Sequence, residues 1–278
     1  MGAGEAVGLD AFPFHIHPDV LGVVTALVGL YLYGLTRLAS RHAPRGERAV
    51  TKRQIVWFAS GIVLFLIVEM WPVHDIAEGS LYSFHMVEHL VLALLVPPAL
   101  LKGTPWWLLR LLVKPILPVL RVLTRPIVAL LLFNGIFALM HAPVMVEAML
   151  GGALVHFLLH GGLIGSAFLM WWPVIGPIPD LPRLTPLMSM GYLFLQSLIP
   201  TIPASFLTFA DEPVYEIYET LPRLWGLSAL DDQLIAGLIM KIGGGAILWT
   251  VIAVVFFTWA FEEERAAREA RRLRLPSP

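Results

Sequence analysis

The sequence predicts an all-α integral membrane protein, a bundle of seven transmembrane helices with the N-terminus outside and the C-terminus in the cytoplasm. Hydrophobic residues make up 58% of the chain and charged residues only 14%, and the mean hydropathy of +0.77 is far above that of an ordinary soluble domain. Apolar stretches recur along the chain at lengths that suit the roughly 30 Å hydrocarbon layer of a bilayer. Basic residues are concentrated in alternate connections between these stretches, which indicates a fixed orientation.

The first three predicted spans are separated by one basic and one acidic connection. Residues 20–38 are mostly apolar and follow a polar N-terminal stretch, and a run of arginines and lysines separates them from the second span, residues 55–71. A short acidic loop, residues 72–80, leads to the third span, residues 82–101, whose apolar run ends in a proline pair. Each span is long enough, or nearly long enough, to cross the hydrocarbon layer as a helix.

Proline-rich and acidic connections delimit the remaining spans. Residues 106–122 are predicted to lie along the inner surface as an amphipathic helix, and the fourth span, residues 127–141, is short. The fifth span, residues 152–172, ends at a loop that contains four prolines. We expect the sixth span, residues 184–208, to kink where its prolines remove backbone donors. The seventh span, residues 233–259, follows the longest acidic loop.

These spans form one predicted integral membrane domain that covers residues 1–278, and residues 260–278 are predicted to be a charged cytoplasmic tail. The N-terminus has no basic region before its first apolar segment and no convincing cleavage site, so we predict no removable signal peptide. We expect membrane lipid around the spans and no nucleic-acid partner.

The distribution of lysine and arginine predicts the orientation of the chain. Six of these residues lie in and around the first connection, five in the third, one in the fifth and five in the tail. The second and fourth connections contain none, the sixth contains one, and Lys241 lies within the seventh span. Cytoplasmic loops carry the excess of basic residues in membrane proteins. The odd-numbered connections and the tail are therefore predicted to be cytoplasmic.

The chain contains no cysteine, which excludes disulfides, thiolate metal ligands and a cysteine nucleophile. Any site for a soft metal must therefore use histidine and methionine.

Eight of the nine histidines fall at the predicted outer end of the bundle. His85 and His89, and likewise His156 and His160, are four residues apart at the start of an inward-running helix. Side chains with this spacing share one helix face, with Cβ atoms about 5–6 Å apart. His141 closes a third helix at the same depth. Because ionisable groups within a membrane bundle are candidates for function, we predict that these five histidines form a metal or haem site.

Other polar residues near this level receive simpler interpretations. We expect His15, His17 and His74 only to form hydrogen bonds with backbone carbonyls and water, as interfacial histidines do. Met86 and Met140 are expected to pack in the core. The roles of Glu88, Asp232 and Lys241 stay open at this point, and no residue is assigned a catalytic role.

Copper is the simplest candidate for the metal, and zinc is the alternative. Imidazole suits copper, zinc and iron, and the lack of cysteine removes the tight thiolate grip and favours a site that can pass its ion on. Zinc is a competitor because His85, Glu88 and His89 match the H-x-x-E-H pattern of inverted zinc peptidases. In such a site the glutamate would act as general base toward a zinc-bound water.

Several short motifs, taken in order, resemble those of a known family, the cytochrome c oxidase assembly factors of the caa3 type, called CtaG. These are seven-helix bacterial membrane proteins linked to copper delivery to the oxidase. The resemblance extends over about residues 18–259. It rests on H-M-x-x-H with a following P-P (His85, Met86, His89, Pro97, Pro98), G-x-P (Gly103, Pro105), H-x-P (His141, Pro143), H-x-x-x-H (His156, His160), W-W-P-V (Trp171 to Val174) and D-Q with a later glycine (Asp232, Gln233, Gly237).

The resemblance implies a non-enzymatic role in maturing the copper centre of a haem-copper oxidase in the bacterial cytoplasmic membrane. It implies that the copper ligands are His85, His89, His141, His156 and His160, and that the partner is the oxidase subunit carrying the copper centre. An extracytoplasmic copper donor is a further candidate partner. Glu88 departs from the family pattern, in which glutamine is expected. The alternatives are a zinc-dependent membrane hydrolase that uses the H-x-x-E-H motif and a haem-binding electron carrier with facing axial histidines.

Overall fold

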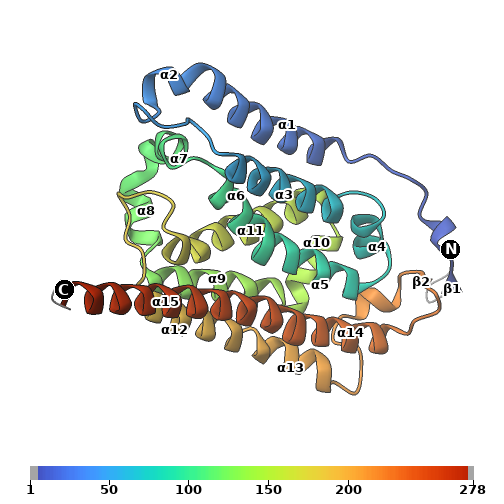
Figure 1. Cartoon of the computed structure of the whole chain (residues 1–278). Helices are drawn as coiled ribbons and strands as arrows, with labels where there is room; N and C mark the ends of the chain where they lie inside the picture. The colour runs from blue at the N-terminus through green and yellow to red at the C-terminus, as the bar shows by residue number, and fades with distance from the viewer. Residues whose placement is uncertain (1–5, 275–278) are drawn as a thin grey trace.

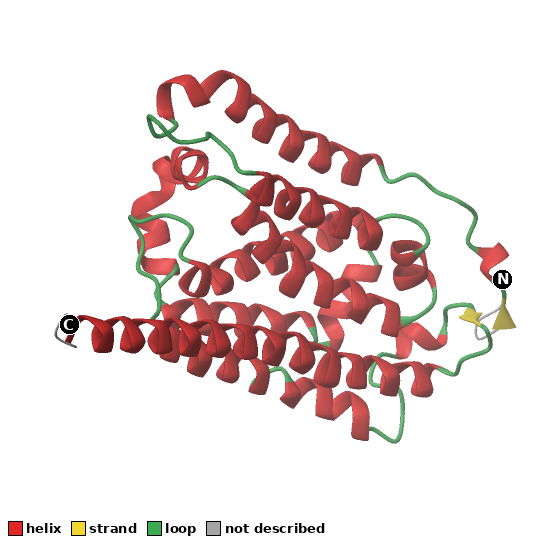
Figure 2. Ribbon diagram, in the orientation of Figure 1, coloured by secondary structure: helices red, strands yellow, loops and turns green. Residues whose placement is uncertain are grey.

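The computed structural model describes residues 6–274, and its regular structure is almost entirely helical (Figures 1 and 2). Two short strands, β1 (Ala6–Val7) and β2 (Arg223–Leu224), pair in parallel and join the N-terminal segment to the loop before the last helices. Six helical segments are long and apolar enough to cross a membrane, or up to seven if a bent pair of helices counts as one span. The structure therefore confirms a nearly all-α chain with several candidate membrane spans.

The helices of the first half of the chain are α1 (Pro18–Tyr33), α2 (Ala39–His42), α3 (Lys52–Glu69), α4 (Val73–Gly79), α5 (Tyr82–Leu90), α6 (Val96–Gly103), α7 (Trp106–Val113) and α8 (Leu117–Leu123). Those of the second half are α9 (Pro126–Met140), α10 (Pro143–Leu150), α11 (Ala153–Ile175), α12 (Pro186–Leu198), α13 (Thr201–Phe209), α14 (Ala229–Leu238) and α15 (Gly244–Arg274). Short 3₁₀ turns occur at Leu9–Ala11, Lys114–Ile116 and Glu216–Glu219, and π-helical turns at Gly34–Leu38, Val91–Leu95 and Ile239–Gly243.

The span Tyr82–Gly103, formed by α5, a π-helical turn and α6, is the central element of the bundle. In its most apolar window 67% of the residues are buried, whereas no other candidate span exceeds 33%. Helices α3, α11 and α14 all pack against it, and Figure 1 shows it enclosed between them. Side chains on this span are therefore the ones most completely removed from lipid and water.

The central span changes from α-helical to π-helical hydrogen bonding just before two prolines. Proline has no backbone N–H, so Pro97 and Pro98 cannot donate to the Ala93 carbonyl as either the α-helical or the π-helical partner. The π-helical turn Val91–Leu95 lies just before them. The indole Nε1 of Trp171, on α11, donates to the Ala93 carbonyl at 3.0 Å. A side chain of a neighbouring helix thus satisfies an acceptor that the prolines leave free, as membrane interiors require.

Two connections that the sequence presented as loops contain helices. Residues 73–79 form α4, which has Asp75 in its first turn, where a negative charge is favoured by the helix dipole. Residues 143–150 form α10, which begins at Pro143, a residue whose fixed φ suits the first helical position. The sixth predicted span is interrupted near its prolines, because α12 ends at Leu198 and α13 begins at Thr201.

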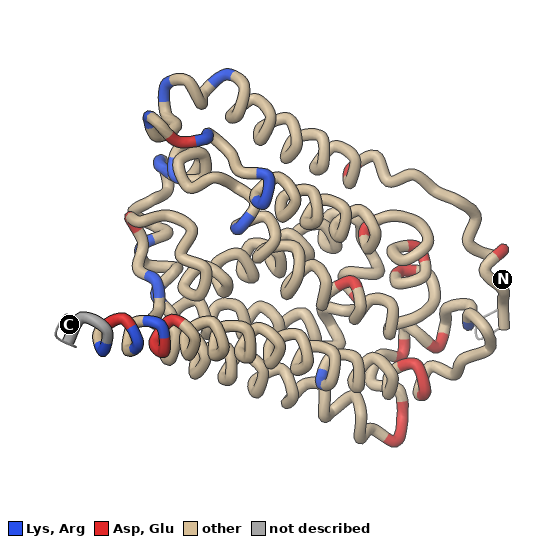
Figure 3. The backbone as a smooth tube through the Cα atoms, in the orientation of Figure 1, with Lys and Arg blue, Asp and Glu red and all other residues tan. Residues whose placement is uncertain are grey.

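The segment before the fourth predicted span turns sharply. Helices α7 and α8 together lie at 91° to α9, the geometry that a helix along the membrane surface would have. Lys and Arg gather at the end of the bundle where the C-terminus lies (Figure 3). Many of the Asp and Glu residues lie at the other end, near the N-terminus, although the tail also carries several glutamates.

Candidate metal centre

Helices α5 and α11 bring the two histidine pairs face to face. The rings of His85 and His89 on α5 have centroids 4.1 Å apart, and so do the rings of His156 and His160 on α11. Between the helices, Nε2 of His89 lies 3.2 Å from Nε2 of His160. The helical spacing therefore produces two shared faces, and helix packing directs them toward each other.

Three of these imidazoles form a compact buried cluster, the histidine trio His85, His89 and His160. Each offers a ring nitrogen, and these nitrogens all lie within 4.8 Å of one another. The three side chains are buried. Among the candidate metal-binding groups in the described part of the chain, this one consists of histidines alone.

The trio has ring nitrogens to which the protein provides no partner. Both nitrogens of His85 and the Nδ1 atoms of His89 and His160 are buried without a hydrogen bond. A buried polar group left unpaired costs about 1–3 kcal/mol, so several of them together make the trio a candidate ligand-binding site. Two nitrogens holding one tetrahedral ion at about 2.0 Å lie about 3.3 Å apart, which matches the 3.2 Å between His89 and His160.

Buried carboxylates lie beside the trio. Glu88, on α5 itself, is fully buried; its Oε1 lies 2.7 Å from Nδ1 of His74 and its Oε2 lies 3.6 Å from Nδ1 of His85. Glu69, at the end of α3, has Oε1 3.5 Å from Nδ1 of His160. A buried negative charge needs a compensating positive charge, and an ion held by the trio would supply it.

His156 belongs to a neighbouring group and not to the trio. Its Nδ1 lies 2.5 Å from Oε1 of Glu78, and Nε2 of His74 lies 3.7 Å from the same oxygen. Ligand atoms of His74, Glu78 and His156 form a second set within 4.8 Å of one another. The ring centroid of His156 nevertheless lies 4.1 Å from that of His160, so the two sets are in contact.

His141 lies at the far side of the trio. Its ring centroid is 6.2 Å from that of His89, its Nδ1 donates to the Phe137 carbonyl at 2.6 Å, and its Nε2 has no partner. Tyr215, in the loop after α13, donates its hydroxyl to the His141 carbonyl at 2.9 Å. Burial raises the pKa of Tyr215 to about 12, so this phenol stays protonated. His141 is thus held next to the trio without being among its close ligand atoms.

Asp232 positions the helix that carries the first histidine pair. Its carboxylate accepts hydrogen bonds from the backbone N–H groups of Tyr82 at 2.8 Å and Ser83 at 3.0 Å, at the beginning of α5. Arg223 donates to the same carboxylate at 3.1 Å. This arrangement gives Asp232 a structural role, whereas Lys241 is exposed and lies with its Nζ 5.9 Å from the centre of the Phe209 ring.

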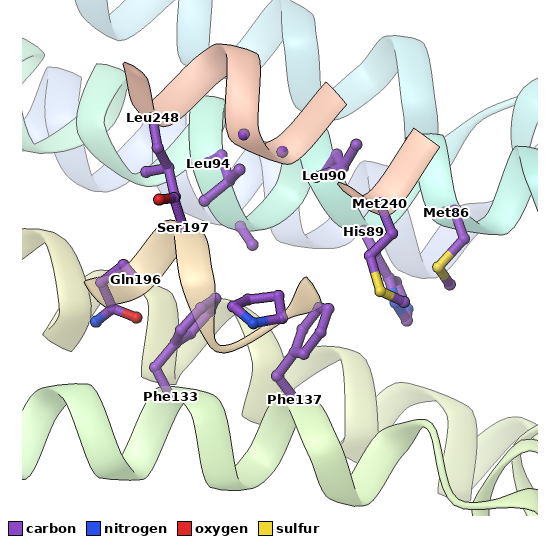
Figure 4. A pocket seen from close by; sticks show the side chains of 14 residues that line it. Met86, His89, Leu90, Leu94, Phe133, Phe137, Gln196, Ser197, Met240 and Leu248 are labelled. Carbon is purple, nitrogen blue, oxygen red and sulfur yellow. The ribbon is translucent and has the colours of Figure 1, made fainter. Parts of the chain in front are cut away.

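An apolar cavity borders His89 (Figure 4). Met86 and Met240 lie at the same end of this cavity as His89, and Phe133 and Phe137 form the opposite wall. Met86 and Met140 are both part of the buried hydrophobic core. This agrees with the packing role expected for the two methionines from the sequence.

Several residues at the centre were not foreseen as site residues. Glu69 and Glu78 were not singled out, and His74 was interpreted as an interfacial histidine. The signal available was the sequence H-D-x-x-E over His74, Asp75 and Glu78, which on a helix would place His74 and Glu78 on one face. The expectation of a loop over residues 72–80 conceals this signal.

Comparisons with known proteins add a family to this geometry. A sequence model of the family described as cytochrome c oxidase caa3 assembly factor matches residues 29–262, which includes all three members of the trio and excludes His15 and His17. Comparisons with curated proteins and with solved structures gave no match.

Proposed function

Because the chain belongs to the family of cytochrome c oxidase caa3 assembly factors, we propose that it binds copper at the outer end of its helix bundle and helps to deliver it to the copper centre of the oxidase. Copper is then cargo and not a permanent cofactor, and the protein carries out no catalytic turnover. The ligands nearest to the ion are His85, His89 and His160, with His156 and His141 next to them.

The histidine trio is the observation that carries this proposal. Imidazole binds copper well, and a site without thiolates releases it more readily than a cysteine site would. The unpartnered nitrogens of His85 and the 3.2 Å separation of His89 and His160 fit a bound ion. The nearby carboxylates of Glu69 and Glu88 compensate its charge.

The proposal includes a topology of seven spans, with the N-terminus outside and the C-terminus in the cytoplasm of a bacterium. Helix α9 has 15 residues, about 22 Å at 1.5 Å per residue, and serves as the fourth span after the perpendicular α7 and α8. The segregation of basic residues to the C-terminal end of the bundle supports this orientation (Figure 3). The trio then faces the compartment where the copper centre of an oxidase subunit, and an extracytoplasmic copper donor, are accessible.

The proposal is tested by the metal content of the detergent-purified protein after loading with copper. We expect the wild type to bind one more copper ion per chain than a variant with His85, His89 and His160 all changed to alanine. His42→Ala is the matched control, because His42 is exposed at the other end of the bundle. In cells, the triple variant should lower the copper content of the oxidase while still inserting into the membrane. Unchanged copper in the triple variant, or a fully copper-loaded oxidase, would refute the proposal.

A zinc hydrolase is the second candidate, favoured by one contact. Oε2 of Glu88 lies 3.6 Å from Nδ1 of His85, within reach of a water on a metal held by the trio. Zinc in place of copper in the purified protein would support this alternative. A haem carrier fits less well, because axial nitrogens on opposite sides of one iron lie about 4 Å apart at metal–nitrogen bonds of about 2 Å, and those of His89 and His160 are 3.2 Å apart.

A further inference from the structure

A third group of metal-binding side chains lies where the N-terminal segment crosses α4. Nε2 of His17 lies 3.0 Å from Oδ2 of Asp75, and Nδ1 of His15 lies 3.8 Å from Oδ1 of the same carboxylate. Ligand atoms of these three residues are within 4.8 Å of one another. Two imidazoles and a carboxylate form a suitable donor set for copper or zinc. We call this group the outer cluster.

Contacts on its N-terminal side fix the segment that carries the outer cluster. The indole Nε1 of Trp71 donates to the Phe12 carbonyl at 2.8 Å, and the ring of Phe14 packs edge-on against Trp71 at 5.6 Å. Further toward the N-terminus, β1 pairs with β2. His15 and His17 are therefore held over α4 by the fold and do not depend on a bound ion for their position.

A continuous series of histidines connects the outer cluster with the trio. Starting from the outer cluster, the ring centroids of His17 and His74 are 4.8 Å apart, those of His74 and His156 are 5.5 Å apart, and those of His156 and His160 are 4.1 Å apart. One cavity is lined by residues of the outer cluster together with Glu78 and His156. An ion would need to move only a few ångströms from one set of ligands to the next.

Solvent exposure falls steadily along this series. The side chain of His15 is 67% exposed, that of His17 14%, that of His156 9% and that of His85 1%. An ion that moves inward therefore loses its water gradually and gains protein ligands at each step.

Carboxylates accompany the histidines along the whole series. Asp75 lies in the outer cluster, Glu78 between His74 and His156, and Glu69 and Glu88 beside the trio. Transfer of a cation into a low-dielectric interior is unfavourable unless charge compensates it, and these groups provide that charge at each stage. The Nε2 atom of His156 is buried without a partner, so a nitrogen in the middle of the series is free to bind a metal ion.

We infer that the outer cluster is a metal-loading site, which captures a copper ion at the surface and passes it through His74, Glu78 and His156 to the trio. The inference rests on the proposed function for its destination, but the outer cluster is a separate site. His15 and His17 lie outside residues 29–262, the segment that matches the family. The loading site is therefore a feature of this chain and not of the family match.

Copper binding by a variant with His15 and His17 changed to alanine tests the inference. The full chain, purified without a histidine tag, is titrated with Cu²⁺, and uptake is followed by stopped-flow quenching of tryptophan fluorescence. We expect two ions per chain in the wild type and one in the variant, and loading of the trio slowed by about tenfold or more, the range in which local charge and capture affect association rates. Asp75→Asn should slow loading as well. The controls are His42→Ala and the triple alanine variant of the trio.

The outcomes separate the loading site from the proposed function. If the His15/His17 variant binds as many ions and loads as fast as the wild type, the loading site is refuted while the trio can still deliver copper. If copper is lost from the His15/His17 variant but retained by the trio variant, the outer cluster binds copper and the proposed function fails. One ion lost in each variant supports both.

Discussion

Each oxygen of Glu88 lies near a different histidine, with Oε1 2.7 Å from Nδ1 of His74 and Oε2 3.6 Å from Nδ1 of His85. Glu88→Gln keeps the oxygen that accepts from His74 and removes only the negative charge near the trio. We expect copper affinity to fall about 10–100-fold, as when partners of metal ligands are changed, with little loss of thermal stability. The measurement is a competition titration against a copper chelator.

Glu147→Gln is the control for this change, because Glu147 is exposed on α10. Equal copper affinity in Glu88→Gln and Glu147→Gln would show that the charge of Glu88 does not act on the ion. Loss of a hydrolytic activity with retained zinc would instead favour the hydrolase.

Asp232 is the residue on which the position of α5 depends most directly. Asp232→Ala removes the acceptor for the N–H groups of Tyr82 and Ser83 and leaves Arg223 without its carboxylate. Removing one partner of a buried ion pair costs about 3–5 kcal/mol of stability. We therefore expect the variant to unfold at a clearly lower temperature in detergent and to bind copper more weakly. Asp231→Ala, a change at an exposed neighbour, should have a much smaller effect. Equal unfolding temperatures for the two variants would contradict the anchoring role.

The sequence predicted the ligands that come from regular helical spacing and missed those that come from tertiary contacts. His85 and His89, and His156 and His160, share a face because of the helix period alone, so their pairing was predictable. His74 joins the site only because α4 folds back onto α5 and brings it to Glu88. His15 and His17 reach Asp75 only because the N-terminal segment is held against Trp71. No pattern in the neighbouring sequence predicts the contact of His74 with Glu88 or that of His15 and His17 with Asp75.

At the level of elements, the central span depends on a hydrogen bond from another helix. Trp171→Phe removes the indole N–H that satisfies the Ala93 carbonyl, an acceptor that Pro97 and Pro98 cannot serve. We expect a loss of about 1–3 kcal/mol of stability, the cost of one buried unsatisfied group, measured by circular dichroism during thermal unfolding in detergent.

Trp172→Phe is the matched control for this prediction. Its side chain is also buried, but its indole Nε1 has no hydrogen-bond partner, so the same substitution removes no bond. The predicted role of the Trp171 hydrogen bond is refuted if Trp172→Phe destabilises the protein as much as Trp171→Phe does.

Long apolar helices could be predicted from composition, whereas short helices in the connections could not. The periodic apolar pattern of the third span is extended enough to identify it. Helices α4 and α10 have only 7 and 8 residues, too few for the pattern to separate a helix from a loop. Because α4 carries His74, Asp75 and Glu78, the expectation of a loop at this short element conceals three residues of the candidate metal-binding groups.

The whole molecule is polarised, because most basic residues lie at the end near the C-terminus (Figure 3). The histidine groups contain Asp75 and Glu78 of α4 and lie toward the other end. In the orientation that we propose from the positive-inside rule, the histidine end is the outer face. A copper route that begins at the outer cluster is consistent only with this orientation, because the ion then reaches the trio without crossing the hydrocarbon layer.

The orientation and the number of spans can be tested by labelling single cysteines, since the natural chain contains none. We expect a membrane-impermeant maleimide added to intact cells to label Glu147→Cys and Glu212→Cys, and to label Arg45→Cys and Ala267→Cys only after the membrane is opened. All four positions are exposed in the structure. Glu147 is the decisive position, because it follows α9. If α9 crosses the membrane, Glu147 lies outside and is labelled in intact cells; if only six helices cross, the connection at Glu147 stays cytoplasmic and is protected.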